Sequence, residues 1–237
     1  MEAGIVAILF LSCFAGGLSV FLFKQDKARS LKLILSFSGA YLFAITVLHL
    51  IPEVYRSGDH LIGIFVLGGF LFQILLEQFS EGIEHGHIHK HRHEHHAFPY
   101  GIMISLCLHA FLEGMPLASG PQQQLVFGIG LHHIPAAFAL ASVLLENRVV
   151  KNKVIILLAV FASMSPLGYL FSNALSSGSI GNITGYFDRI MGVVIGIFLH
   201  ISTTILFESS IDHHFNNKKL GAVLAGIAIA LLNFLLH

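Results

Sequence analysis

Hydrophobic positions in this chain gather into eight long runs, and short polar stretches separate most of them. Each run is long enough for an α-helix to cross about 30 Å of hydrocarbon, which takes roughly 17–25 residues. The pattern therefore predicts an all-α membrane protein with eight transmembrane helices. In chain order the runs are residues 3–23, 31–54, 60–81, 98–120, 122–146, 153–175, 187–209 and 218–236.

The composition agrees with a chain embedded in a lipid bilayer. It is 55% hydrophobic and 11% charged, whereas a soluble domain carries about 25% charged residues. The net charge of zero gives no electrostatic support for nucleic-acid binding. Because most connections are short, neighbours in sequence should be antiparallel neighbours in space. We expect a single polytopic domain over residues 1–237, with a His-rich cytoplasmic loop at 82–97.

The Lys and Arg residues predict the orientation of the helices. The first run lacks a basic N-terminal region and is typical of a transmembrane helix rather than a signal peptide. Of the thirteen Lys and Arg, eleven fall on one side of the predicted membrane, and only Arg56 and Arg189 fall on the other. Basic residues concentrate in cytoplasmic loops. Both termini are therefore expected outside, with the protein in the plasma or inner membrane of the cell.

Two of the runs contain residues that hydrocarbon does not tolerate. In the fourth run His109 and Glu113 are four residues apart, so they share one helix face about 6 Å apart along the axis. In the fifth run His132 and His133 precede Pro135. Ionisable side chains inside a membrane mark a functional site by default. An imidazole and a carboxylate suit a divalent transition metal, with zinc the first candidate.

The histidines and the glutamate of these two runs lie at similar depths in the predicted membrane. His109 lies about 16 Å from the inner end of its run, and His132 about 15 Å from the outer end of the next. Adjacent antiparallel helices should therefore bring His109, Glu113 and His132 to one level near the midplane. His132 and His133 diverge by about 100° around their helix. Both can ligate one ion only if Pro135 distorts the backbone there.

Other ionisable residues extend from this level towards the two faces of the membrane. His49 and Glu53 end the second run near the outer face, either as a hydrated helix end or as a cation entrance. Glu77 and Glu81 end the third run near the inner face, either as a hydrated helix end or as a metal exit. In the seventh run His200 lies near the midplane and Glu208 near the inner end. These possible pathway residues are His49, Glu53, Glu77, Glu81, His200 and Glu208.

Residues 85–96 contain seven histidines in twelve positions. A polar, low-complexity tract of this kind binds metal weakly and multivalently. Its alternative interpretation is a solvated cytoplasmic loop.

At this point the chain resembles the ZIP (Zrt/Irt-like protein) family of divalent-metal transporters. Residues 109–114 begin with His-Ala and end with Glu-Gly, where the family's fourth helix has a His, often an Asn, and then an acid followed by Gly. Residues 132–136 read His-His-Ile-Pro-Ala, where the family has His-Glu-Ile-Pro and a further His or acid. Residues 49–53 also look like the family's second helix. Eight spans, with a His-rich loop between the third and fourth, extend the resemblance to the whole chain.

The resemblance implies a gradient-driven or uniporter-like permease, often dimeric, that moves zinc towards the cytoplasm without ATP hydrolysis. Some members move Fe²⁺, Mn²⁺ or Cd²⁺. It also implies that a bundle of helices one, four, five and six slides against the other four. By analogy His109, Glu113 and His132 are the core metal ligands, and His133 is a helper. The expected partners are metal ions, the lipid bilayer and a second copy of the chain.

The chain departs from the family pattern at three places. Ala110 replaces the frequent Asn, Ala136 replaces a second ligand, and residues 163–165 read Ser-Met-Ser where some members have a Glu. Glu113 is then the one carboxylate expected at this depth. Two dications held close together need bridging anions to offset their repulsion, so we expect a site for a single ion.

Two other classes of function compete with a transporter. A membrane-embedded zinc hydrolase could use Glu113 as a general base on metal-bound water, although the sequence contains no His-Glu-x-x-His motif. A metal sensor or scaffold could use the His-rich tract as its working part. The transporter remains the leading hypothesis, with no enzyme activity and no catalytic cofactor.

Overall fold

The structure is a computed structural model, and it describes residues 2–22, 28–80, 82, 99–118, 122–177, 186–208 and 217–236. Within these ranges eight helices are long and apolar enough to cross a membrane, which confirms the all-α prediction of eight spans. The His-rich tract, Glu81 and the side chain of Glu208 lie outside the described residues.

Most predicted runs correspond to one helix each, and two of the spans end in short turns of other helix types. The elements are α1 (Glu2–Leu18) with a 3-10 turn (Ser19–Phe21), α2 (Ala28–Ile45), a π-helical turn (Thr46–Leu50), α3 (Ile51–Tyr55), α4 (Ile62–Ser80), α5 (Tyr100–Gly114) with a 3-10 turn (Met115–Ala118), α6 (Gln122–Glu146), α7 (Lys151–Ser176), α8 (Phe187–Glu208) and α9 (Asn217–Leu236).

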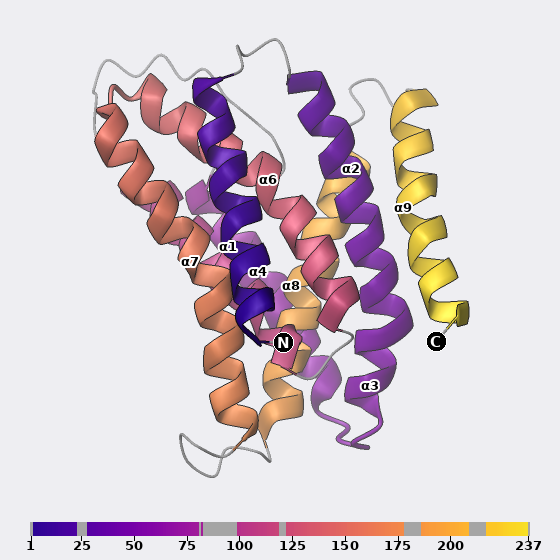
Figure 1. Ribbon diagram of the computed structural model, residues 1–237. Coiled ribbons are helices and arrows are strands. Elements are labelled where there is room, and N and C mark those ends of the chain that lie inside the picture. Colours follow the sequence, from indigo (N-terminus) through magenta and orange to yellow (C-terminus); the bar gives the residue numbers. More distant parts are fainter. Residues whose placement is uncertain are drawn as a thin grey trace.

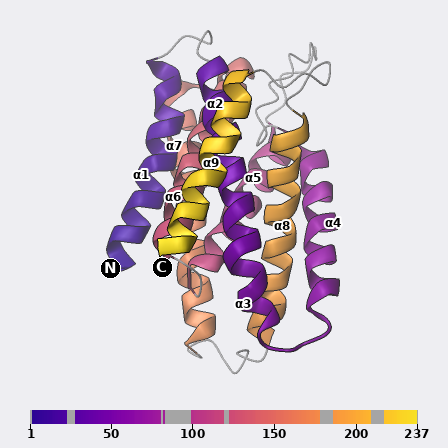
Figure 2. The same ribbon diagram turned by 90° about the vertical axis from the view of Figure 1, so that its right-hand side faces the viewer.

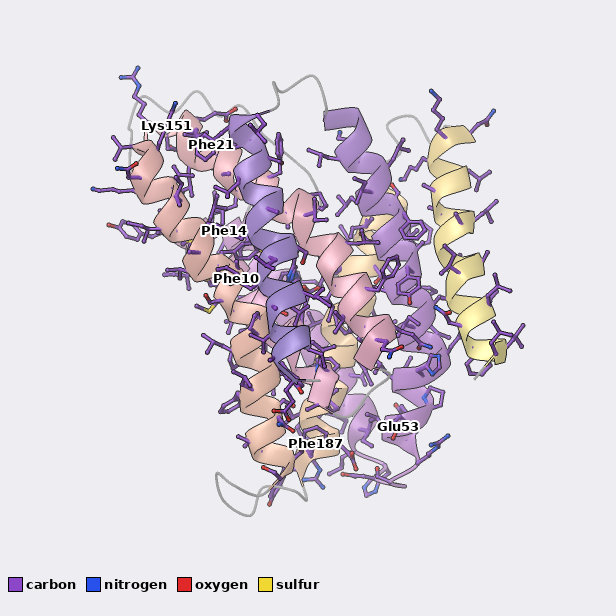
Figure 3. All side chains as sticks on the ribbon, in the orientation of Figure 1. Phe10, Phe14, Phe21, Glu53, Lys151 and Phe187 are labelled. Carbon is purple, nitrogen blue, oxygen red and sulfur yellow. The ribbon has the colours of Figure 1, made fainter. Side chains whose placement is uncertain are left out.

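The two ends of the chain lie at the same end of the bundle, as Figures 1 and 2 show. In Figure 3, Phe21 and Lys151 mark one end of the bundle, and Glu53 and Phe187 mark the opposite end. This arrangement agrees with an even number of membrane crossings. The assignment of the Lys151 end to the cytoplasm stays a prediction.

The helices form two sets that pack mainly within themselves. In the first set α1 packs on α6 and α7, and α5 packs on α7. In the second set α4 packs on α8, and α2 packs on both α9 and α8. Figure 2 shows α4 beside α8 at one edge of the molecule. The sets meet where α2 contacts α6 and where α4 contacts α5, and these sets match the two groups that the family resemblance implies.

The outward face of α4 shows why the bundle needs a bilayer. Ile64, Leu67, Leu71 and Leu75 follow one another at helical spacing, and each exposes more than half of its surface. An apolar stripe of this size is costly in water but suits contact with lipid chains.

Two glycines bring helix backbones into direct contact. A Cβ on Gly69 of α4 would collide with the backbone carbonyl of Val193 in α8. A Cβ on Gly114 of α5 would collide with the backbone carbonyl of Ser165 in α7. Small residues permit this close approach of membrane helices. The second contact fixes α5 against α7 directly beside Glu113.

The prolines inside the helices disturb the backbone less than the sequence suggests. The α6 helix runs from Gln122 to Glu146 with Pro135 inside it, and α7 likewise runs through Pro166. The α5 span turns to 3-10 geometry around Pro116, and the second span has a π-helical turn just before Pro52. The site on α6 is therefore presented by a continuous helix.

Candidate metal centre

The candidate metal centre is built around the carboxylate of Glu113 on α5. His133 Nε2 lies 2.6 Å from Glu113 Oε2. On the other oxygen, Oε1, His109 Nε2 lies at 3.5 Å and His132 Nε2 at 3.8 Å. All four side chains expose at most 2% of their surface. The structure therefore brings together the three imidazoles and the carboxylate that the sequence predicted.

Helix geometry explains how the four side chains meet. His109 and Glu113 are one turn apart on α5 and lie on one face, as residues four apart do. His132 and His133 are adjacent on α6 and point in directions about 100° apart, with ring centroids separated by 6.0 Å. The carboxylate of Glu113 reaches between these two rings and offers one oxygen to each. The continuous α6 helix satisfies both contacts without a break at Pro135.

Three of the four residues have the geometry of a metal site. One ligand atom each from His109, Glu113 and His132 lies within 4.8 Å of the others. In a tetrahedral zinc site with bonds of about 2.1 Å, neighbouring donors are about 3.4 Å apart. The 3.5 Å and 3.8 Å separations to Glu113 Oε1 come close to that spacing. Two imidazoles and one carboxylate are also a donor set that zinc accepts, with water in the fourth position.

Gln73 of α4 is a site residue that the sequence analysis missed. Its side chain is fully buried, and its Oε1 lies 3.4 Å from His109 Nδ1. A polar residue inside the third run, one turn before Glu77, was the available signal. That signal could be used only with the knowledge of which face of α4 packs against α5.

Two of the three positions that depart from the family pattern, Ala110 and Ala136, are packed rather than open. Ala110 and Ala136 are buried in an apolar cluster with Leu106 and Phe161. Cys13 lies in the same cluster, and it forms no disulfide. Among the described residues these positions offer the site no further oxygen ligand.

Two of the possible pathway residues, His200 and Glu77, pair with each other. His200 Nε2 on α8 lies 3.4 Å from Glu77 Oε2 on α4. The His200 ring also packs edge-on against Phe70, with centroids 5.0 Å apart. His200 therefore contributes to a contact between α4 and α8, although its depth alone suggested the level of the metal centre.

The other two described pathway residues lie on the second span. The His49 ring packs edge-on against Phe234 of α9, with centroids 5.2 Å apart. Glu53 is more than half exposed, and its carboxylate lies 3.7 Å from Arg56. Neither of these two contacts involves Glu113 or its histidines.

An ion pair joins α8 to the connection before α4 at the same end of the bundle as Glu53. Arg189 Nε donates to Asp59 Oδ2 at 2.7 Å, and the guanidinium lies over the rings of Phe65 and Tyr186. The hydrogen bond from Arg189 is the main cause that holds the pKa of Asp59 below its usual value, and a backbone bond from Leu61 adds to it. This pair links the start of α8 to the connection that leads into α4.

Comparisons with known proteins show what family the chain resembles. A family model described as "ZIP Zinc transporter" matches residues 85–233, which is more than half of the chain. The chain is 29% identical to zinc transporter ZIP9-B of Xenopus laevis over 175 residues, a match that covers 68% of this chain and 57% of that protein. It is 28% identical to zinc transporter ZIP9 of Xenopus tropicalis over the same length, with the same coverage. The chain thus matches less than two thirds of the length of these curated relatives.

Proposed function

Because the chain belongs to the ZIP zinc transporter family, we propose that it moves a divalent transition metal, zinc first, across the membrane towards the cytoplasm. The observation that carries this proposal is the buried set of three donors on His109, Glu113 and His132. Ionisable groups at this depth are expensive in hydrocarbon, and a bound dication offsets that cost. Fe²⁺, Mn²⁺ and Cd²⁺ are further candidate substrates, because imidazole and carboxylate donors also suit them.

In this proposal the ion binds at one site on its way across the membrane and does not pass through an open pore. The four side chains of the centre are buried, so the ion must lose most of its hydration shell to bind among them. A relative movement of the two helix sets, α1, α5, α6 and α7 against the others, would open the centre to one face at a time. His49 and Glu53 would attract ions at the outer face. Glu77, with His200, would receive them towards the inner face, followed by Glu81 and Glu208.

Two features argue against a hydrolase at the same centre. The ZIP family consists of transporters rather than enzymes. Both oxygens of Glu113 face imidazoles, and its side chain is fully buried. A general base needs a free oxygen within reach of the water that it activates beside a substrate, whereas one oxygen of Glu113 is held by His133 and the other faces the metal position. A sensor based on the His-rich tract lies outside the described residues and gains no support from them.

The assembly and the location are further parts of the proposal. We propose a homodimer in the plasma or inner membrane, with both termini outside. The exposed apolar faces of α4 and α9 support contact with lipid or with a second copy. The proposed site takes a single ion, since Glu113 is the one carboxylate that the described residues place among the imidazoles.

Metal flux into liposomes tests the proposal directly. The purified full chain is reconstituted into liposomes that contain a zinc-sensitive dye, and Zn²⁺ is added outside. The wild-type chain should load the liposomes with zinc, while Glu113→Gln should be reduced to the rate of empty liposomes, because the amide carries no charge to offset the dication. Glu146→Gln is the matched control, since Glu146 is the exposed last residue of α6. Equal flux by wild type and Glu113→Gln would exclude this site as the transport site.

A further inference from the structure

We propose that Gln73 of α4 is a positioning residue for the metal ligand His109. It acts through the imidazole of His109 by holding that ring so that Nε2 faces the metal position. This inference rests on the proposed function, because it assigns a role within the same metal centre.

The two nitrogens of the His109 ring face different groups. On one side Nδ1 lies 3.4 Å from Gln73 Oε1. On the other side Nε2 lies 3.5 Å from Glu113 Oε1. The amide and the carboxylate therefore bracket the imidazole from opposite sides, so that a rotation of the ring would disturb both contacts.

This bracket selects the form of the ring that can bind metal. A neutral imidazole carries its proton on one nitrogen and a lone pair on the other. An amide oxygen facing Nδ1 accepts a hydrogen bond from Nδ1–H, and this leaves the Nε2 lone pair for the ion. The reverse amide orientation would place a donor against Nδ1, move the proton to Nε2 and block the ligand position. Groups that fix a metal-binding histidine through its second nitrogen commonly orient the ring in this way.

The burial of Gln73 points to the same role. The side chain is fully buried within an otherwise apolar part of α4, and its Nε2 has no hydrogen-bond partner among the described residues. Burying an amide with an unsatisfied N–H costs free energy. An apolar residue of the same length would avoid that cost, so packing alone does not account for a glutamine here.

The contact also crosses the boundary between the two helix sets, because α4 and α5 belong to different sets. A second polar contact crosses the same boundary: Ser105 Oγ of α5 donates to the carbonyl of Leu76 in α4 at 2.7 Å. Both contacts are buried. Ser105 therefore offers a matched control, since its removal breaks a bond between the same helices without touching His109.

The test compares zinc affinity with stability for the purified full chain. Zinc Kd is measured by competition with a fluorescent chelator, and the unfolding temperature is measured without metal. Gln73→Met removes the acceptor while keeping a straight side chain, and it should weaken zinc binding about 10- to 100-fold. The metal-free unfolding temperature should stay the same or rise, since a buried amide with an unsatisfied N–H is lost. Gln73→Glu restores an acceptor and should return the affinity to the wild-type range.

Two further variants separate a positioning role from general packing. Ser105→Ala should leave the zinc Kd unchanged. In a His109→Ala background, Gln73→Met should have no additional effect, because the ring that it positions is absent. An unchanged Kd for Gln73→Met, or an equal loss of affinity in Ser105→Ala, would overturn the inference and leave the proposed function intact. Failure of the wild-type chain to bind zinc would overturn both.

Discussion

His133 Nε2 lies 2.6 Å from Glu113 Oε2, closer than either of the other two imidazoles comes to this carboxylate. The contact occupies the oxygen that faces away from His109 and His132. It separates the roles of the two adjacent histidines on α6. We therefore propose that His132 is a metal ligand, whereas His133 holds and orients the carboxylate of Glu113.

We therefore predict different effects of the same substitution at these two positions. His132→Gln should abolish zinc flux, because it removes a ligand. His133→Gln should weaken zinc affinity about 10- to 100-fold and leave flux measurable, because a glutamine amide can still donate to Glu113 Oε2. The apparent KM and the maximal rate of zinc uptake into liposomes distinguish the two results. Complete and equal loss of flux in both variants would show that His133 is itself an essential ligand.

The number of bound ions is a second prediction. One dication beside a single carboxylate and neutral imidazoles leaves the centre at a net charge of about +1, and a second ion would raise it to about +3. Metal analysis of the purified chain with residues 85–96 deleted should therefore give one zinc per chain. The deletion is needed because the His-rich tract can bind metal by itself. Two anomalous diffraction peaks about 4 Å apart at the centre would contradict the prediction.

The grouping of the residues at the candidate metal centre was predictable because their spacing and their depth can both be counted along the sequence. Residues four apart share a helix face, and counting from the helix ends placed His109 and His132 at one level. Depth does not fix the direction in which a side chain points. His200 has a similar depth, yet it faces Glu77 on α4. For the same reason Gln73 escaped notice, since adjacency of the third and fourth spans does not show which face of α4 meets α5.

The helices themselves were predictable to within a few residues, because long apolar runs have few alternatives in a bilayer. The run at 60–81 corresponds to Ile62–Ser80, and the run at 122–146 corresponds to Gln122–Glu146. The π-helical turn at Thr46–Leu50 was not predicted. It precedes Pro52, which cannot donate a backbone hydrogen bond, but local sequence does not distinguish a π turn from a kink or a helix end.

Two neighbouring glycines of α4 should respond oppositely to the same change. Gly69→Ala would force a methyl group against the Val193 carbonyl, and it should destabilise the bundle by about 1–3 kcal/mol. Gly68→Ala meets no atom within 4 Å and should stabilise the helix by about 0.5–1 kcal/mol. Unfolding temperatures in detergent measure both variants. Similar behaviour of the two alanines would show that α4 and α8 do not pack backbone to backbone.

The orientation of the bundle can be tested with single cysteines. Ser57 and Lys151 are both exposed and lie in the connection before α4 and at the start of α7. If the basic side is cytoplasmic, Ser57→Cys should react with an impermeant thiol reagent in intact cells, and Lys151→Cys should react only after the membrane is opened. The chain without either change gives the background from Cys13 and Cys107. Reversed labelling would place both termini in the cytoplasm.

The Asp59–Arg189 pair predicts a pH dependence of stability. The pKa of Asp59 is lowered in the folded chain by its hydrogen bond with Arg189, so the carboxylate stabilises the fold at pH values above its unfolded pKa of about 3.9. This contribution is lost as the pH falls through the lower, folded pKa. Asp59→Asn should therefore reduce the unfolding temperature at pH 7, and its difference from wild type should shrink in strong acid. A difference that is constant with pH would show that the charge of Asp59 is not involved. Asp188→Asn, in the first turn of α8, provides the control.

Glu113 is the one carboxylate that the described residues place among the three imidazoles, and this has an electrical consequence. With neutral histidines the empty centre carries a charge of −1, and a bound dication reverses it to +1. A voltage that is negative in the cytoplasm would pull the loaded centre inward and push the empty centre outward. Each elementary charge that crosses 100 mV corresponds to about 2.3 kcal/mol of work. A transporter with a single acid at its centre can therefore draw on the membrane voltage in both halves of its cycle, without any nucleotide.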